Sequence, residues 1–220
     1  MNTEENSTAL TAKEHHIVKI AAFTATGKID LLKMALNEGL NSGLTVNKIK
    51  EVLIQLYAYC GFPRSLNGIN AFMNVIEDRK ANGIEDKAGS EAQKVESSDK
   101  YLQGQRTLEK LSGVPQFGPL SGANAFAPGI DLFLKEHLFA DIFGRGVLTF
   151  VERELATVTV LATISGLEGQ LEFHIGAGLN VGLSKQQLED TFLIIKEHIS
   201  ESQAVVGNEI LIKVIDQKNK

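Results

Sequence analysis

A single histidine, His174, stands in an otherwise mostly apolar helical stretch, QLEFHIGAGLNVGLS, at residues 170–184. An imidazole titrates near neutral pH and can act as a general acid or base, but it also serves as a packed core residue. Glu154 lies upstream, directly before the apolar run LATVTVLATIS. The sequence leaves two roles open for its carboxylate, which either complements the dipole at the start of a helix or orients His174 from a neighbouring helix.

Two stretches of the chain are diverged copies of one unit. Residues 13–79 align without a gap with residues 152–218, at an offset of 139, and keep glycine in four places. The matched glycines are Gly27 and Gly166, Gly39 and Gly178, Gly43 and Gly182, and Gly68 and Gly207. The chain is therefore predicted to contain a tandem repeat.

The two copies differ where chemistry is expected. The alignment sets Ala35 against His174 and His15 against Glu154. The unit can thus be built without the imidazole or the carboxylate, which favours a functional role for both and leaves a structural role open.

The first copy carries distinctive residues of its own, Tyr57, Tyr59 and Cys60, followed by the turn GFPR. If the copies pack about a pseudo-twofold axis, we expect these three side chains to bind substrate in one site with His174 and Glu154, leaving a second potential site vestigial. The structural alternative is that the tyrosines are half-buried with surface hydroxyls and that the cysteine is a small buried hydrophobe.

Apolar residues three and four positions apart predict helices, and no segment has the pattern of a strand, so the fold class is all-α. The third helix of each copy is expected over about 46–59 and 185–198. Ser184 and Gln187 have the spacing of a capping box, and Pro63 is expected to open a fourth helix in the first copy.

The segment at 81–100, ANGIEDKAGSEAQKVESSDK, is polar and charged and is predicted to be a linker. The predicted organisation is a first repeat at 13–80, this linker, and a second repeat at 101–220. The second repeat begins with a leading segment that has a short helix, a loop-like stretch and a further helical stretch.

The composition narrows the functional classes. Lys and Arg number 22 against 27 Asp and Glu, a formal net charge of −5, which disfavours nucleic acid as a partner. No signal peptide or membrane-spanning pattern is evident, so we expect a cytoplasmic protein without a membrane partner. One cysteine and five scattered histidines give no disulfide and no metal motif.

The stretch VERELATVTVLATISGLEGQLEFHIGAGLNVGLSKQQLED resembles the carboxymuconolactone decarboxylase family, and LIQLYAYCGFPRSLNGINAFMNV resembles the segment that follows in its members. Upstream, FADIFGRGVLTFVEREL is similar to the start of the decarboxylases and carries Arg145. The resemblance implies two alkylhydroperoxidase D-like helical units in an all-α homo-oligomer, a trimer or a hexamer.

The resemblance also implies a lyase reaction, in which a small carboxylated lactone such as 4-carboxymuconolactone loses CO2 without a metal or organic cofactor. In this reaction Arg145 would hold the substrate carboxylate, His174 would be the acid and base, and Glu154 would set its tautomer. Tyr59 would face the lactone.

Two alternatives stay open. The alkylhydroperoxidase D proteins of the same superfamily, which are peroxiredoxin-like antioxidants, use a CxxC pair before the position of His174. Here that region reads GLEGQLEFH, without a cysteine. The other alternative is a non-catalytic oligomeric scaffold that keeps the assembly and has lost the chemistry.

Overall fold

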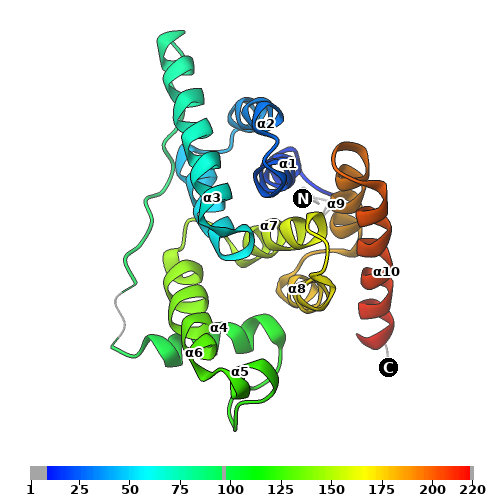
Figure 1. Cartoon of the computed structure of the whole chain (residues 1–220). Helices are drawn as coiled ribbons and strands as arrows, with labels where there is room; N and C mark the ends of the chain where they lie inside the picture. The colour runs from blue at the N-terminus through cyan, green and yellow to red at the C-terminus, as the bar shows by residue number, and fades with distance from the viewer. Residues whose placement is uncertain (1–8, 96–97, 219–220) are drawn as a thin grey trace, which may run out of the picture.

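The computed structural model describes residues 9–95 and 98–218, and every regular element in these ranges is a helix. The first copy of the repeat forms α1 (Ala12–Thr26), α2 (Ile29–Asn41) and α3 (Val46–Ala81). The second copy forms α7 (Phe150–Thr163), α8 (Glu168–Val181), α9 (Lys185–His198) and α10 (Glu201–Lys218) (Figure 1). The predicted all-α fold with two tandem units is confirmed.

Side-chain caps fix where these helices begin. Thr11 and Thr149 precede α1 and α7, and each accepts from the backbone of a glutamate three residues later that bonds back to it. Ser184 and Gln187 form the same reciprocal pair at the start of α9, as the sequence predicts. Each cap satisfies backbone N–H groups that a helix leaves free, a contribution of about 1 kcal/mol.

A glycine divides α3 in two. Gly61 has φ of 80° and ψ of 158°, a backbone conformation outside the helical region that residues with a side chain rarely adopt. The fourth helix predicted near Pro63 therefore exists as the second half of a kinked α3. Pro63 lies in the first turn after the kink, where its missing N–H costs little.

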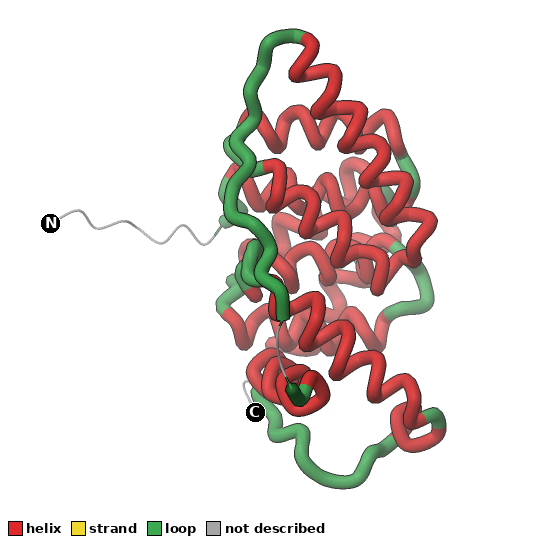
Figure 2. The backbone as a smooth tube through the Cα atoms, turned by 90° about the vertical axis from the view of Figure 1, so that its left-hand side faces the viewer, coloured by secondary structure: helices red, strands yellow, loops and turns green. Residues whose placement is uncertain are grey.

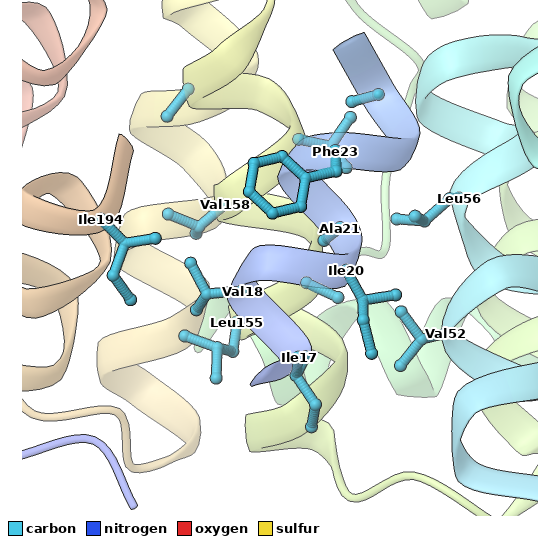
Figure 3. Packing of buried hydrophobic residues seen from close by; sticks show 14 of the residues in the cluster. Ile17, Val18, Ile20, Ala21, Phe23, Val52, Leu56, Leu155, Val158 and Ile194 are labelled. Carbon is cyan, nitrogen blue, oxygen red and sulfur yellow. The ribbon is translucent and has the colours of Figure 1, made fainter. Parts of the chain in front are cut away.

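The core lies where the two copies meet. Helices α1 and α7 pack against each other, and each also packs against α3 and α9. Figure 3 shows Val18 and Ile20 of α1 between Leu155 of α7, Val52 of α3 and Ile194 of α9. All five side chains are buried, so a single hydrophobic core joins the two copies.

The leading segment of the second copy forms a separate group of helices at one end of the molecule (Figure 1). It contains α4 (Lys100–Ser112), α5 (Gly122–Phe126), α6 (Pro128–Leu132), the π-helix η1 (Phe133–Ile142) and the 3₁₀-helix η2 (Phe143–Arg145). The stretch predicted to be loop-like holds α5 and the start of α6. Helix α4 packs closely on η1, because Gly104 brings its backbone against the carbonyl of Lys135.

The described part of the polar segment at 81–100 runs in an extended form along the first copy (Figure 2). The backbone N–H groups of Val46 and Asn47 donate to the carbonyls of Lys87 and Ala88. Arg79 also holds Asp86 through two hydrogen bonds of 2.7 and 2.8 Å. The segment is thus fixed to the start and the end of α3.

No helix in the described ranges is both long and apolar enough to cross a membrane.

Candidate functional site

His174 and Glu154 meet between two neighbouring helices of the second copy. Nδ1 of His174 on α8 lies 2.7 Å from Oε2 of Glu154 on α7, and both side chains are buried. An ionised carboxylate only accepts hydrogen bonds, so Nδ1 carries the proton in this contact. The pairing leaves Nε2 as the imidazole nitrogen available to a ligand.

Tyr59 reaches the same place from α3 of the first copy. Its ring lies perpendicular to that of His174, with 5.5 Å between ring centroids. The hydroxyl is buried near Thr157 without reaching hydrogen-bond geometry, and burial together with the nearby Glu154 raises the pKa of Tyr59. A buried hydroxyl without a partner is rare and favours a role in binding.

A cavity of about 410 Å³ opens onto these side chains. Its lining comes from α3, α4, η1, α8 and the loop after α4. The lining residues are Ala58, Tyr59, Leu108, Gln116, Leu134, Leu138, Phe139, Gly169, Gln170, Phe173 and His174. A larger hollow of about 600 Å³ beside α4 and Phe150 is not lined by His174. We place the candidate site at the smaller cavity, which His174 lines and Glu154 supports from behind through its contact with Nδ1.

Arg145 does not join this site. Its Nε and Nη2 atoms donate to Glu51 of α3 at 2.8 to 3.0 Å, and Arg145 does not line the cavity. Glu51 occupies the fork of the guanidinium, so Arg145 forms an ion pair between the two copies. In this arrangement Arg145 is not placed to bind a substrate carboxylate in the cavity in the way that the sequence predicts. The hydrogen bonds that Arg145 donates to Glu51 raise the pKa of Arg145 further.

A second arginine, Arg153, lies next to Glu51, the partner of Arg145. Arg153 is fully buried, donates from Nη1 to Gln55 at 2.8 Å and has Nη2 3.7 Å from Glu51. Burial lowers its pKa to about 10. The sequence reasoning missed Glu51 and Gln55, although a carboxylate and an amide four residues apart within an apolar helix were a signal of buried polar contacts.

The other two predicted substrate-binding residues lie outside the cavity lining. Tyr57 stacks on Phe62, with ring centroids 4.5 Å apart, and faces His137. The thiol of Cys60 donates to the carbonyl of Leu56 at 3.2 Å, and burial raises its pKa to about 11. Of the three residues predicted in the first copy, the structure brings only Tyr59 to His174.

The apolar lining from α4 and η1 was not anticipated from the sequence. Leu108, Leu138 and Phe139 belong to the leading segment, which the sequence analysis treated only as helix and loop. In the described residues no group of three or more His, Cys, Asp or Glu side chains is placed to hold a metal ion.

The fold and the site define a tandem-repeat, all-helical protein whose two copies share one core, with a buried histidine–glutamate pair at a cavity. The sequence model of the carboxymuconolactone decarboxylase family matches residues 2–73 and 128–197, more than half of the chain. The protein belongs to this family. A search of curated proteins found no match.

Proposed function

We propose that the protein is an enzyme that transfers a proton at a carbon next to a carbonyl group, with His174 as general acid and base. The observation that carries this proposal is the 2.7 Å contact between His174 and Glu154 at the wall of a cavity. A histidine held in one tautomer by a carboxylate, with its other nitrogen free for a ligand, is the arrangement that general base catalysis requires.

The reaction follows from the three side chains. Nε2 of His174 takes a proton from the substrate carbon, and Glu154 stabilises the imidazolium that forms. The electrons left by the proton move onto the carbonyl oxygen as an enolate. We infer that the Tyr59 hydroxyl, buried beside His174 without a hydrogen-bond partner, donates to this oxygen when substrate is bound. Return of the proton from Nε2 to another carbon moves the double bond. Tyr59 is protonated near neutral pH already at the ordinary tyrosine pKa of 10.0, and burial raises its pKa further, so the hydroxyl is a donor.

Decarboxylation of a small carboxylated lactone, such as 4-carboxymuconolactone, is the first reaction to test within this proposal. Nε2 of His174 first takes the proton of the substrate carboxylic acid. Loss of CO2 from the resulting carboxylate leaves an enolate, and the imidazolium returns that proton to carbon. No metal or organic cofactor is required. Because Arg145 is paired with Glu51, the carboxylate of such a substrate would depend on His174 and the amide of Gln170.

The test compares wild-type protein with His174→Gln. The two proteins are incubated in D2O with 4-carboxymuconolactone and with uncharged lactones and ketones, and deuterium incorporation and CO2 release are measured. His137→Gln is the matched control, because His137 is exposed and lies beside Asp141 on the surface. We expect activity in the wild type and the control and its loss in His174→Gln. Equal rates in all three proteins, or no reaction with any compound, would reject the proposal.

Assembly with further copies is a second part of the proposal. Large apolar side chains are exposed from α5 to the start of η1, with Phe126 94% exposed and Phe133 66% exposed. Exposed apolar surface, where it is large, marks interfaces in soluble proteins. A homo-oligomer, a trimer or a hexamer, would cover it.

A further inference from the structure

The lining of the His174 cavity contains no charged side chain. Among the residues that form it, the polar groups are Tyr59, Gln116, Gln170 and His174, and the rest are apolar or glycine. The volume of about 410 Å³ lies at the lower end of the range for small-molecule sites, about 300–1,000 Å³. The cavity is thus suited to a small ligand that is mostly hydrocarbon.

The charged side chains next to the cavity lining have a net charge of zero among themselves. Glu154 and Glu51 supply two negative charges, and Arg145 and Arg153 supply two positive charges. Arg145 is bound through two of its nitrogens to Glu51, and Arg153 is enclosed by Gln55 and the ring of Phe143. Neither guanidinium is presented to the cavity.

A ligand carboxylate would therefore enter an apolar space as an extra charge. The imidazole is the one group in the lining that can become positive, and Glu154 already faces it at 2.7 Å. Burying a charge without a partner is unfavourable, whereas burying hydrocarbon against leucine and phenylalanine side chains is favourable.

We propose that the substrate is an uncharged, largely hydrocarbon carbonyl compound, and that the apolar cover from α4 and η1 selects it over carboxylated analogues. This inference rests on the proposed proton-transfer function of His174. Leu108 of α4 and Leu134, Leu138 and Phe139 of η1 provide this cover. Leu108 lies outside both segments matched by the family model, whereas Leu134, Leu138 and Phe139 lie within the second of them.

The test uses one carboxylated lactone in two forms, the free acid and its methyl ester, which share a skeleton and differ in charge. Binding to the wild-type protein is measured by calorimetry at neutral pH, and shifts in the NMR signals of His174 and Phe173 show that the ligand occupies the cavity. We expect the ester to bind at least tenfold more tightly than the acid. Equal affinity, tighter binding of the acid, or no binding of either form at millimolar concentration would overturn the inference.

A substitution in the cavity lining tests whether charge causes the preference for the ester over the acid. Gln170 is an exposed residue of α8 that lines the cavity, so Gln170→Arg adds a cation with little risk to folding. This variant should gain affinity for the acid and lower the ratio of ester to acid affinity at least tenfold, whereas the neutral Gln170→Met, which only removes the amide, should leave the ester the tighter ligand. The same gain in both variants would show that charge is not the cause and would also overturn the inference.

Binding and turnover separate the two proposals. Preferential binding of the ester, without deuterium exchange that depends on His174, would leave the substrate class standing and reject the proton-transfer function. Exchange that depends on His174, together with tighter binding of the acid, would support the proton-transfer function and reject the uncharged substrate class.

Discussion

Replacement of Glu154 by glutamine separates a catalytic role from a structural one. The carboxylate accepts a hydrogen bond from Nδ1 of His174 at 2.7 Å, and its other oxygen, Oε1, is buried without a partner. A hydrogen bond to a charged group contributes about 1.5–3 kcal/mol, against about 0.5–1.5 kcal/mol between neutral groups. The loss of about 1–1.5 kcal/mol from the imidazolium state corresponds to a rate about tenfold lower.

The same change should leave stability nearly intact. Glutamine keeps the shape of the side chain and puts an amide in place of a carboxylate that is fully buried. Since burial of a charge opposes folding, its removal compensates for the weaker hydrogen bond. We expect the free energy of unfolding to change by less than about 1 kcal/mol, within the range of substitutions that create no cavity.

The assay pairs two measurements on Glu154→Gln. Deuterium exchange into the substrate reports the chemistry, and chemical denaturation reports stability. The ¹⁵N shifts of His174 add a readout that needs no substrate, because loss of the carboxylate should mix the two imidazole tautomers. Glu172→Gln is the control, since Glu172 lies on the same helix and pairs with Lys213 at 2.7 Å, away from the cavity lining. Full activity in Glu154→Gln, or a loss explained entirely by unfolding, would refute the reasoning.

Three further substitutions and one chemical modification test other parts of the molecule. Gly104→Ala would place a Cβ atom 1.8 Å from the carbonyl oxygen of Lys135. We therefore expect the free energy of unfolding to fall by about 1–3 kcal/mol and ligand binding to weaken. An unchanged melting temperature and unchanged binding would contradict the close packing of α4 on η1. The Cys60 thiol, with its pKa raised from 9.0 to about 11, should react with iodoacetamide about 100-fold more slowly at neutral pH than in the unfolded chain, and rapid oxidation by peroxide would revive the peroxidase alternative. Asp131→Asn leaves buried Lys135 without its charge partner and should cost about 3–5 kcal/mol. Although burial alone would raise the pKa of Asp131, its hydrogen bonds lower it overall. This stabilisation should therefore be full above the pKa of the unfolded carboxyl and be lost as pH falls through the lower folded value, and hydrogen-exchange protection factors across residues 98–147 that do not change over this pH range would contradict it. Finally, Phe126→Ser should shift the mass measured by light scattering toward a smaller species if the α5–α6 face joins copies, and an unchanged mass would exclude Phe126 from the interface.

The repeated glycines show how much of the fold was readable from sequence. A side chain at Gly68 would meet Leu53 at 2.9 Å, and one at its counterpart Gly207 would meet the ring of Phe192 at 2.6 Å. Gly43 and Gly182 have φ of 90° and 113°. Each pair is kept for the same local reason in both copies, namely a close helix contact or a left-handed cap, so matching glycines at a constant offset was sufficient to predict the repeat.

The candidate site was only partly predictable, because its decisive contacts join distant parts of the chain. A comparison of the two copies singled out His174, Glu154 and Tyr59, which lie together, and also Tyr57 and Cys60, which lie outside the cavity lining. Arg145 precedes the aligned residues 152–218, so the comparison says nothing of it, and its partner Glu51 lies 94 residues away in the sequence. The apolar cover was missed for a related reason, since ordinary helical spacing does not tell which neighbour a helix will face.

The divergence of the copies argues for one working site in each chain. At the position related to the site by the repeat, Ala35 takes the place of His174, His15 that of Glu154 and His198 that of Tyr59. His15 and His198 lie close enough that the charge of His198 helps lower the pKa of His15, after burial and the charges of Lys19 and His16. The imidazole of His15, whose protonation is opposed by burial and neighbouring cations and which has no buried carboxylate to fix its tautomer, lacks what His174 obtains from Glu154. The segment that covers the His174 cavity lies between the copies and occurs once in the chain, so it adds its apolar lining at one of the two positions. Restoring a histidine by Ala35→His should therefore produce no second activity, and a doubled rate would show that the imidazole alone was the missing part.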